Sequence, residues 1–94
     1  MLKFHVTKGI YELVKQGKKL TEYRDFTHYW EKRLANIVTK LPYRSAIVKG
    51  YSSEEIPIII KNIGTTNKDS INVVAQMLIK TDWCYSIEYD LVED

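Results

Sequence analysis

The spacing of apolar residues changes from segment to segment along this chain, and that change most constrains the fold. Leu2, Phe4 and Val6 alternate with polar residues, as expected of a strand with one buried face. Residues 84–92 alternate in the same way near the other end of the chain. Residues 56–63 (IPIIIKNI) are apolar and β-branched, which favours a central strand. We therefore expect strands near both ends and in the middle of the chain.

Two segments follow the period of a helix instead. Apolar residues recur every three or four positions over 6–14, where Thr7 suits the N-cap and Gly17 a left-handed C-terminal cap. A second apolar stripe covers residues 30–38 and follows another candidate N-cap, Thr27. The pattern thus predicts two helices in the first half of the chain.

The remaining segments are shorter or less distinct. Residues 20–25 alternate with polar groups on both sides, and residues 45–49 resemble a strand. Residues 64–70 are polar and predict a loop, whereas residues 71–79 fit either a helix or a strand. The strands are too short and too few for a sandwich. We predict an α+β fold in which a small β-barrel carries two helices packed outside it, as a single domain over residues 1–94.

Several classes of site are not indicated by the composition. Cys84 is the single cysteine, so no internal disulfide can form, and its apolar neighbours predict a buried thiol. His5 and His28 are isolated and form no metal-ligand pair, and no glycine motif for a nucleoside triphosphate is present. We expect no metal and no cofactor. No apolar run reaches the roughly 20 residues of a membrane span, and the start lacks a signal-peptide pattern, so we expect no membrane partner and a cytoplasmic location.

Charge is divided unequally between the two halves of the chain. Residues 1–49 carry eleven Lys and Arg against four Asp and Glu, a net charge of +7, whereas residues 50–94 carry three against eight, a net charge of −5. Clustered cations raise the local concentration of anions and speed their association. The split therefore favours an anionic partner for the first half, unless the two halves only neutralise each other across the fold.

The densest polar cluster extends from Gly17 to Leu34. If residues 20–25 form a strand, Glu22 and Arg24 share one face, because side chains at positions i and i+2 point to the same side. A carboxylate held ionised by a neighbouring cation can bind a ligand or act as a general base. The alternative is an exposed ion pair beside solvated lysines, which contributes little.

This cluster resembles the signature of the ASCH domain, a PUA-like β-barrel family that includes small phage and bacterial proteins. The resemblance covers residues 2–63. It rests on a Gly-Lys-Lys turn, a Glu-x-Arg strand, a Tyr-Trp-x-x-Arg-Leu helix and a Gly-Tyr turn, matched here by Gly17, Lys18, Lys19, Glu22, Arg24, residues 29–34, Gly50 and Tyr51. It implies a barrel whose cleft binds RNA or modified nucleosides.

One branch of the PUA-like proteins consists of amidohydrolases that deacylate N4-acetylcytidine with a Lys, a Thr and a Glu. The resemblance places Lys19 at the position of the catalytic Lys, but Glu22 stands at the position of the Thr. Thr21 is one residue away, and sliding the motif by one position aligns it together with Lys18. No motif selects the third group among the acidic residues Glu54, Glu55 and Glu88.

Three functions follow as hypotheses. The first is a domain that binds RNA or a nucleotide, in which Glu22 accepts from a base edge. In that domain the cations Lys18, Lys19, Arg24 and Arg33 contact phosphate, and the aromatic residues Tyr29, Trp30 and Tyr51 lie in the binding surface. The second is a nucleoside amidohydrolase or RNA hydrolase with Lys19, Thr21 and Glu22 as catalytic residues. The third is a module of the phage inhibitor type that binds a protein partner.

Overall fold

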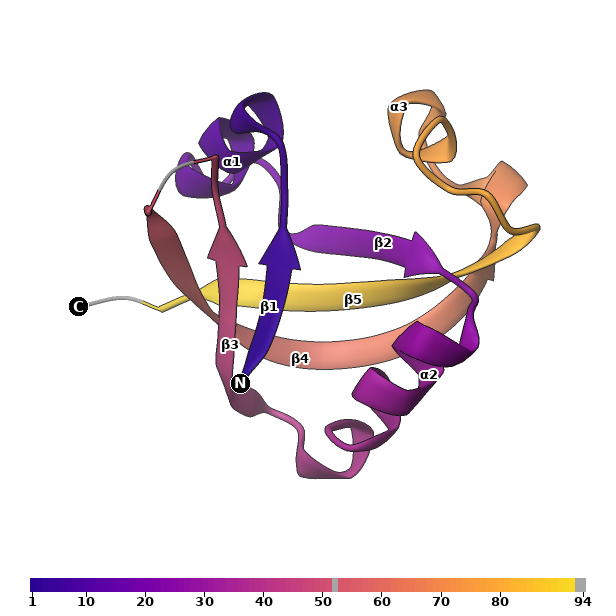
Figure 1. Ribbon diagram of the computed structural model, residues 1–94, viewed down its shortest axis with the longest axis horizontal. Coiled ribbons are helices and arrows are strands. Elements are labelled where there is room, and N and C mark those ends of the chain that lie inside the picture. The colour runs from indigo at the N-terminus through magenta and orange to yellow at the C-terminus, as the bar shows by residue number, and fades with distance from the viewer. Residues whose placement is uncertain (52, 93–94) are drawn as a thin grey trace.

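The computed structural model, which describes residues 1–51 and 53–92, is an α+β fold built on one curled sheet (Figure 1). Residues 52, 93 and 94 of the predicted domain lie outside the described residues. Five strands pair in the order β1-β3-β4-β5-β2. Their bounds are Leu2–His5 for β1, Thr21–Asp25 for β2, Tyr43–Lys49 for β3, Glu55–Asn67 for β4 and Trp83–Leu91 for β5.

The sheet curls into a half barrel whose two edges are the first two strands of the chain. Strands β3, β4 and β5 form an antiparallel meander, to which β1 adds in parallel beside β3 and β2 adds in antiparallel beside β5. Among the described residues, no backbone pairing joins β1 to β2. The prediction of an α+β, barrel-like fold is thus confirmed in its coarse form. We call the unpaired boundary between β1 and β2 the seam.

Both predicted helices form, and both begin at the predicted N-cap. Helix α1 covers Lys8–Lys15, and the Thr7 hydroxyl accepts a hydrogen bond from the backbone N–H of Ile10. Helix α2 covers His28–Ala35 and is capped by Thr27. Short 3-10 turns follow at Val38–Lys40 and Lys68–Ser70, and a third, one-turn helix, α3, covers Val73–Gln76.

The chain leaves α1 through a left-handed glycine. Gly17 has a φ of +74°, its N–H donates to the Val14 carbonyl, and the N–H of Lys18 donates to the Leu13 carbonyl, both at 2.9 Å. This pair of bonds is the Schellman cap, which favours glycine because other L-residues are strained at positive φ. The turn delivers Lys18 and Lys19 directly to the start of β2.

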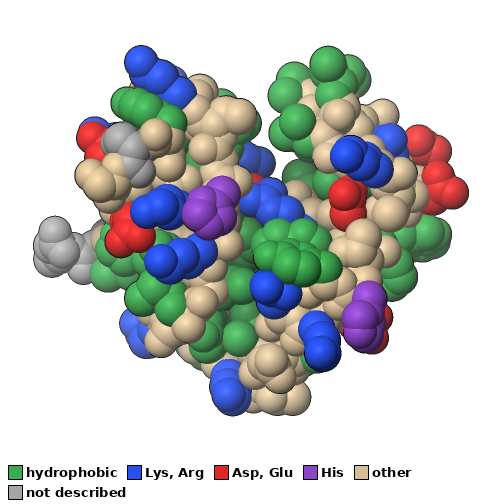
Figure 2. Space-filling view, viewed as in Figure 1, with side chains coloured by type: hydrophobic (Ala, Val, Ile, Leu, Met, Phe, Trp, Pro, Cys, Tyr) green, Lys and Arg blue, Asp and Glu red, His purple; other side chains and the backbone are tan. Residues whose placement is uncertain are grey.

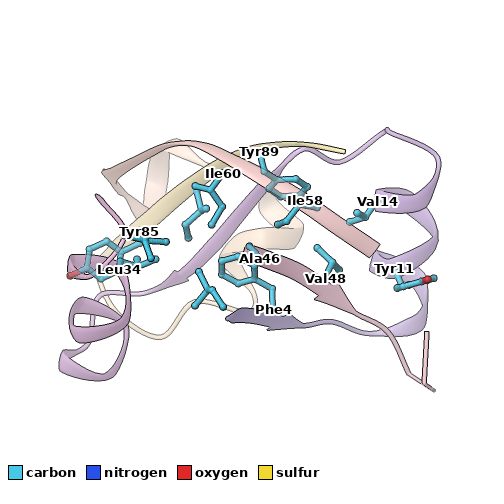
Figure 3. Close-up of a cluster of buried hydrophobic side chains, with 13 residues drawn as sticks. Phe4, Tyr11, Val14, Leu34, Ala46, Val48, Ile58, Ile60, Tyr85 and Tyr89 are labelled. Atoms are coloured by element: carbon cyan, nitrogen blue, oxygen red, sulfur yellow. The ribbon is translucent and has the colours of Figure 1, made fainter. Parts of the chain in front are cut away.

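The main core fills the concave side of the half barrel (Figure 3). Its most buried side chains come from alternate positions of four strands, which explains the period of two in the sequence. Both α1 and α2 also contribute to it, through Val14 and Leu34. The strand residues that are less than 2 % exposed are Phe4, Ala46, Val48, Ile58, Ile60, Cys84, Ile87 and Tyr89, of which Cys84 belongs to a different cluster.

A second, smaller cluster lies under α3. Ile71, Ala75 and Ile79 pack against Cys84 of β5, and Tyr23 of β2 covers them from one side. The buried thiol predicted at Cys84 is confirmed. This cluster attaches the segment 71–79 to the outer part of the sheet.

Two expectations for the second half of the chain need correction or completion. The loop predicted over residues 64–70 is wrong in part, because β4 continues to Asn67 and pairs with β5 as far as the Asn67–Trp83 register. Backbone pairing stabilises this polar end, and β-branched Thr65 and Thr66 favour it. The ambiguous residues 71–79 form α3 and turns. None of the helices formed by the described residues has the length and hydrophobicity needed to span a bilayer.

Candidate functional site

A cavity of about 490 Å³, which we call cavity one, lies beside the seam between α1 and α3. Figure 2 shows the surface hollowed between these two elements, with apolar side chains on the α3 side. The walls are apolar, with Val6, Ile10 and Leu13 on one side and Val74, Ala75 and Leu78 on the other. The polar residues that line it are His5, Thr7, Lys18, Lys19, Glu22, Tyr23, Arg24 and Asn72.

Glu22 is the buried charged group of this cavity. It is the second residue of β2 and points inward, and only 2 % of the residue is exposed. One carboxylate oxygen, Oε2, accepts from Nη1 of Arg24 at 2.9 Å. The other, Oε1, is buried and has no hydrogen-bond partner among the described residues. A buried acceptor without a donor costs free energy, and a donor that reached this oxygen would recover that cost.

Arg24 bridges the seam and fixes Glu22. Besides Glu22, its guanidinium donates to the backbone oxygen of Tyr23 on β2 at 2.9 Å and to that of His5 on β1 at 3.4 Å. These bonds span both edges of the half barrel. Arg24 therefore holds the carboxylate in place and donates to a backbone carbonyl on each edge strand of the sheet.

The aromatic ring of Trp30 lies beside the guanidinium of Arg24. Its ring stacks on Phe4 with the centroids 5.8 Å apart, and the Arg24 guanidinium lies 5.5 Å from the Trp30 centroid. Trp30 is packed against the main core and does not line cavity one. Its contribution to the site is thus to position the cation.

The turn that carries Lys18 and Lys19 is held to the sheet by two hydrogen bonds of Lys19. Lys19 Nζ donates to the Thr21 carbonyl at 2.7 Å, and the Lys19 carbonyl accepts from the Tyr89 hydroxyl at 3.1 Å. Burial raises the pKa of Tyr89, the negative charge of Glu22 raises it further, and Arg24 opposes the shift. Tyr89 therefore stays protonated and remains a donor at neutral pH.

The structure brings four of the predicted site residues together. Lys18, Lys19, Glu22 and Arg24 all line cavity one. Thr21, at the start of β2, does not line it. Its contribution to the site is the backbone carbonyl, which accepts a hydrogen bond from Lys19 Nζ.

The aromatic and arginine residues of α2 lie elsewhere. Tyr29 and Arg33 line a second cavity of about 340 Å³, which we call cavity two. Tyr51 lines neither cavity; it is 54 % exposed and contacts Tyr11 edge to face, with Lys8 Nζ 5.3 Å from its ring centroid. Of the predicted aromatic residues, none stacks into cavity one.

The three acidic candidates for a catalytic set are also outside cavity one. Glu54, Glu55 and Glu88 are exposed, and none of them lines either cavity. Glu55 pairs with Lys49 at 3.6 Å. Among the described residues, no group of three His, Cys, Asp or Glu side chains could hold a metal ion.

The sequence did not predict the wall that the α3 segment forms. Asn72, Val74 and Leu78 line cavity one opposite α1. The only local signal was Asn72, a good N-cap residue whose Oδ1 accepts from the Ala75 N–H at 2.8 Å. His5, considered only as a metal ligand, lines both cavities.

Comparisons with known proteins returned no matching family model, no matching curated protein and no matching solved structure. The resemblance to the ASCH domain, with its amidohydrolase branch, therefore stays a prediction.

Proposed function

We propose that this protein binds RNA or a nucleotide, with one base inserted into cavity one. The observation that carries this proposal is the buried, unpartnered Oε1 of Glu22. Oε2 of the same carboxylate is occupied by Arg24, so one acceptor is left for a ligand donor. The exocyclic amine of cytosine, adenine or guanine is a donor of the required kind.

The remaining surface of cavity one suits the faces of a base. Ile10 and Leu13 from α1 stand on one side, and Val74 and Leu78 from the α3 segment on the other. A flat heterocycle between them would bury apolar surface on both faces, while its polar edge meets Glu22. The volume of about 490 Å³ lies within the roughly 300–1,000 Å³ typical of small-molecule sites.

The cations of the cavity exceed what Glu22 needs for neutralisation. Arg24 forms the ion pair with Glu22, which leaves the charges of Lys18 and Lys19 for an anionic ligand. Lys18 is exposed, whereas Lys19 is held by the Thr21 carbonyl. We assign Lys18 to the phosphate of the bound nucleotide and Arg24 to the positioning of Glu22.

The half barrel with helices at its ends supports a PUA-like fold as part of this proposal. The resemblance implies a cleft for RNA or modified nucleosides, and we propose cavity one as that cleft.

Cytidine and uridine 5′-monophosphates provide a matched pair of probes, because the two bases differ in the amine or carbonyl at the edge expected to meet Glu22. Titration calorimetry on the wild-type protein should show tighter binding of the cytidine nucleotide by about tenfold or more, the effect of one hydrogen bond to a charged group. Binding should weaken as salt rises.

Glu22→Gln sharpens this test. The amide oxygen can still accept from Arg24, but the atom facing the ligand becomes an N–H donor, so the preference should shift from cytidine toward uridine. Glu88→Gln is the matched control, because Glu88 is exposed on β5 and lines neither cavity. The melting temperature of each variant checks that it is folded.

Two results would contradict the proposal. One is that none of the cytidine, uridine, adenosine and guanosine 5′-monophosphates binds at millimolar concentration; the other is that the cytidine and uridine nucleotides bind equally and Glu22→Gln changes nothing. Either result removes cavity one as a base site.

Hydrolysis of an acylated nucleoside is the second candidate, because Lys19 and Glu22 line the same cavity. The geometry favours binding alone, since Lys19 Nζ is engaged by a carbonyl and Thr21 lies outside the cavity. Incubation of N4-acetylcytidine with a large amount of protein, followed by chromatography, distinguishes the two functions. Release of cytidine that is lost in Lys19→Ala would establish the hydrolase.

A further inference from the structure

Cavity two is a separate site that the base-binding function does not use. We propose that it binds the phosphate adjoining the nucleotide in cavity one, so that the ligand is a single strand of two or more nucleotides. This inference rests on the proposed function, because it requires one nucleotide to be seated in cavity one.

Continuity between the two cavities is the first argument. His5, the last residue of β1, lines both of them. The carbonyl of His5 accepts from Arg24, which also holds Glu22 at the floor of cavity one. A chain leaving the base site over the end of β1 therefore reaches cavity two directly.

Charge is the second argument. Cavity two is lined by the cationic side chains Lys3 and Arg33 together with His5, and no Asp or Glu lines it. In the described part of the chain, neither Lys3 nor Arg33 forms an ion pair. Figure 2 shows Lys and Arg side chains gathered over the face that carries β1 and α2, the elements that supply these residues. Cations without protein counterions favour an anionic ligand.

The placement of Arg33 is the third argument, and it selects phosphate over a base. Its guanidinium carbon lies 3.5 Å from the centroid of Tyr29, and Nη1 donates to the Tyr29 carbonyl at 3.3 Å. The cation covers that face of the ring, so a base cannot stack there. The guanidinium is held in one place with further N–H groups available, an arrangement that suits the oxygens of a phosphate.

Nucleotides of increasing length test the proposal. The probes are cytidine 5′-monophosphate, the dinucleotide pCpC, and a dinucleotide whose second residue lacks its base. In calorimetric titrations we expect both dinucleotides to bind about tenfold or more tightly than the mononucleotide, because a charge-assisted phosphate contact is added. The salt dependence should steepen by about 0.7 per added phosphate contact.

Two variants locate the gain. Arg33→Gln and Lys3→Gln should each remove most of the advantage of the dinucleotide while leaving the affinity for the mononucleotide unchanged. Arg44→Gln is the matched control, since Arg44 is exposed and lines neither cavity. Equal melting temperatures of wild type and variants confirm that folding is intact.

The outcomes separate this inference from the function on which it rests. If the mononucleotide does not bind, the proposed function fails first. If it binds but the dinucleotides gain nothing, or if the gain survives both substitutions in cavity two, this inference alone is overturned. Loss of the gain in the abasic probe would assign cavity two to a base and likewise overturn it. RNA and DNA dinucleotides should gain equally, and a gain confined to RNA would point to the 2′-hydroxyl and contradict a phosphate site.

Discussion

The two hydrophobic clusters of this protein differ in how many elements they join, and cavity one lies between them. The main core joins four strands with α1 and α2, whereas the smaller cluster holds only the segment 71–79 against β5 and Tyr23. In the segment 71–79, Val73 is 72 % exposed and Met77 is 80 % exposed, so much of the apolar surface of this segment is not packed within the described part of the chain. The α1 wall of cavity one is therefore held by a larger hydrophobic cluster than the α3 wall.

Because of this difference, we expect one wall of cavity one to be rigid and the other to move more easily. The carboxylate Glu22 and the wall formed by α1 are fixed by the main core, which holds the hydrogen-bonding edge of the cavity in place. The α3 wall is attached by a few side chains, and such regions open at a lower free-energy cost than the whole domain. We expect the polar edge to set which ligand binds and the α3 wall to adjust to its size.

The largest expected effect comes from the main core. Ile60 is completely buried, and Ile60→Ala should lower the free energy of unfolding by about 2–5 kcal/mol, because it removes buried methyl groups and leaves a cavity. Ile79→Ala makes the same chemical change in the small cluster and should lower global stability by about 1 kcal/mol, since that segment can open by itself. Urea denaturation measures both. Equal losses would show that the two clusters form a single cooperative core.

An intermediate effect is expected at the cap of α3. Asn72→Ala removes the side-chain acceptor for the Ala75 N–H and should destabilise this helix by about 0.5–2 kcal/mol. Amide hydrogen exchange should accelerate over residues 73–79 and stay unchanged in β4 and β5. Acceleration across the whole sheet would contradict the local attachment of α3.

The smallest expected effect concerns the thiol of the small cluster. Burial raises the pKa of Cys84 above its ordinary value of 9.0, and the nearby charge of Asp25 raises it further. While the α3 segment is packed against it, the thiol is therefore mainly protonated at pH 8. Labelling at that pH requires the segment to open. A thiol reagent should react slowly with native protein and faster with Asn72→Ala. Labelling as fast as in urea would show that Cys84 is not protected by the cluster.

Sequence predicted best those features that depend on neighbours along the chain. The alternation in β1, β2 and β5, the N-caps Thr7 and Thr27, and the glycine cap at Gly17 are all local signals, and the structure confirms them. The polar end of β4 could not be predicted, because it is stabilised by pairing with β5 rather than by its own apolar residues.

In the candidate site, too, arrangements within one short segment could be predicted from the sequence, whereas contacts between distant segments could not. Glu22 and Arg24 are two positions apart, so their sharing one face of a strand could be predicted from spacing, and Lys18 and Lys19 lie just before that strand. The bond from Arg24 to the His5 carbonyl joins residues 19 positions apart, and the wall of α3 approaches α1 only in the folded chain. Composition and periodicity carry no record of such contacts.

The order of strands in the sheet also bears on the order of events during folding. The meander of β3, β4 and β5 forms between neighbours in the chain, whereas β1 must meet β3 at the Leu2–Ala46 register and β2 must meet β5 at the Thr21–Glu88 register. Closing those longer loops costs more entropy. We therefore expect the two strands that build the seam to join an existing meander, so that cavity one is completed late in folding. Substitutions in cavity one should then change mainly the rate of unfolding and leave the rate of folding nearly unchanged.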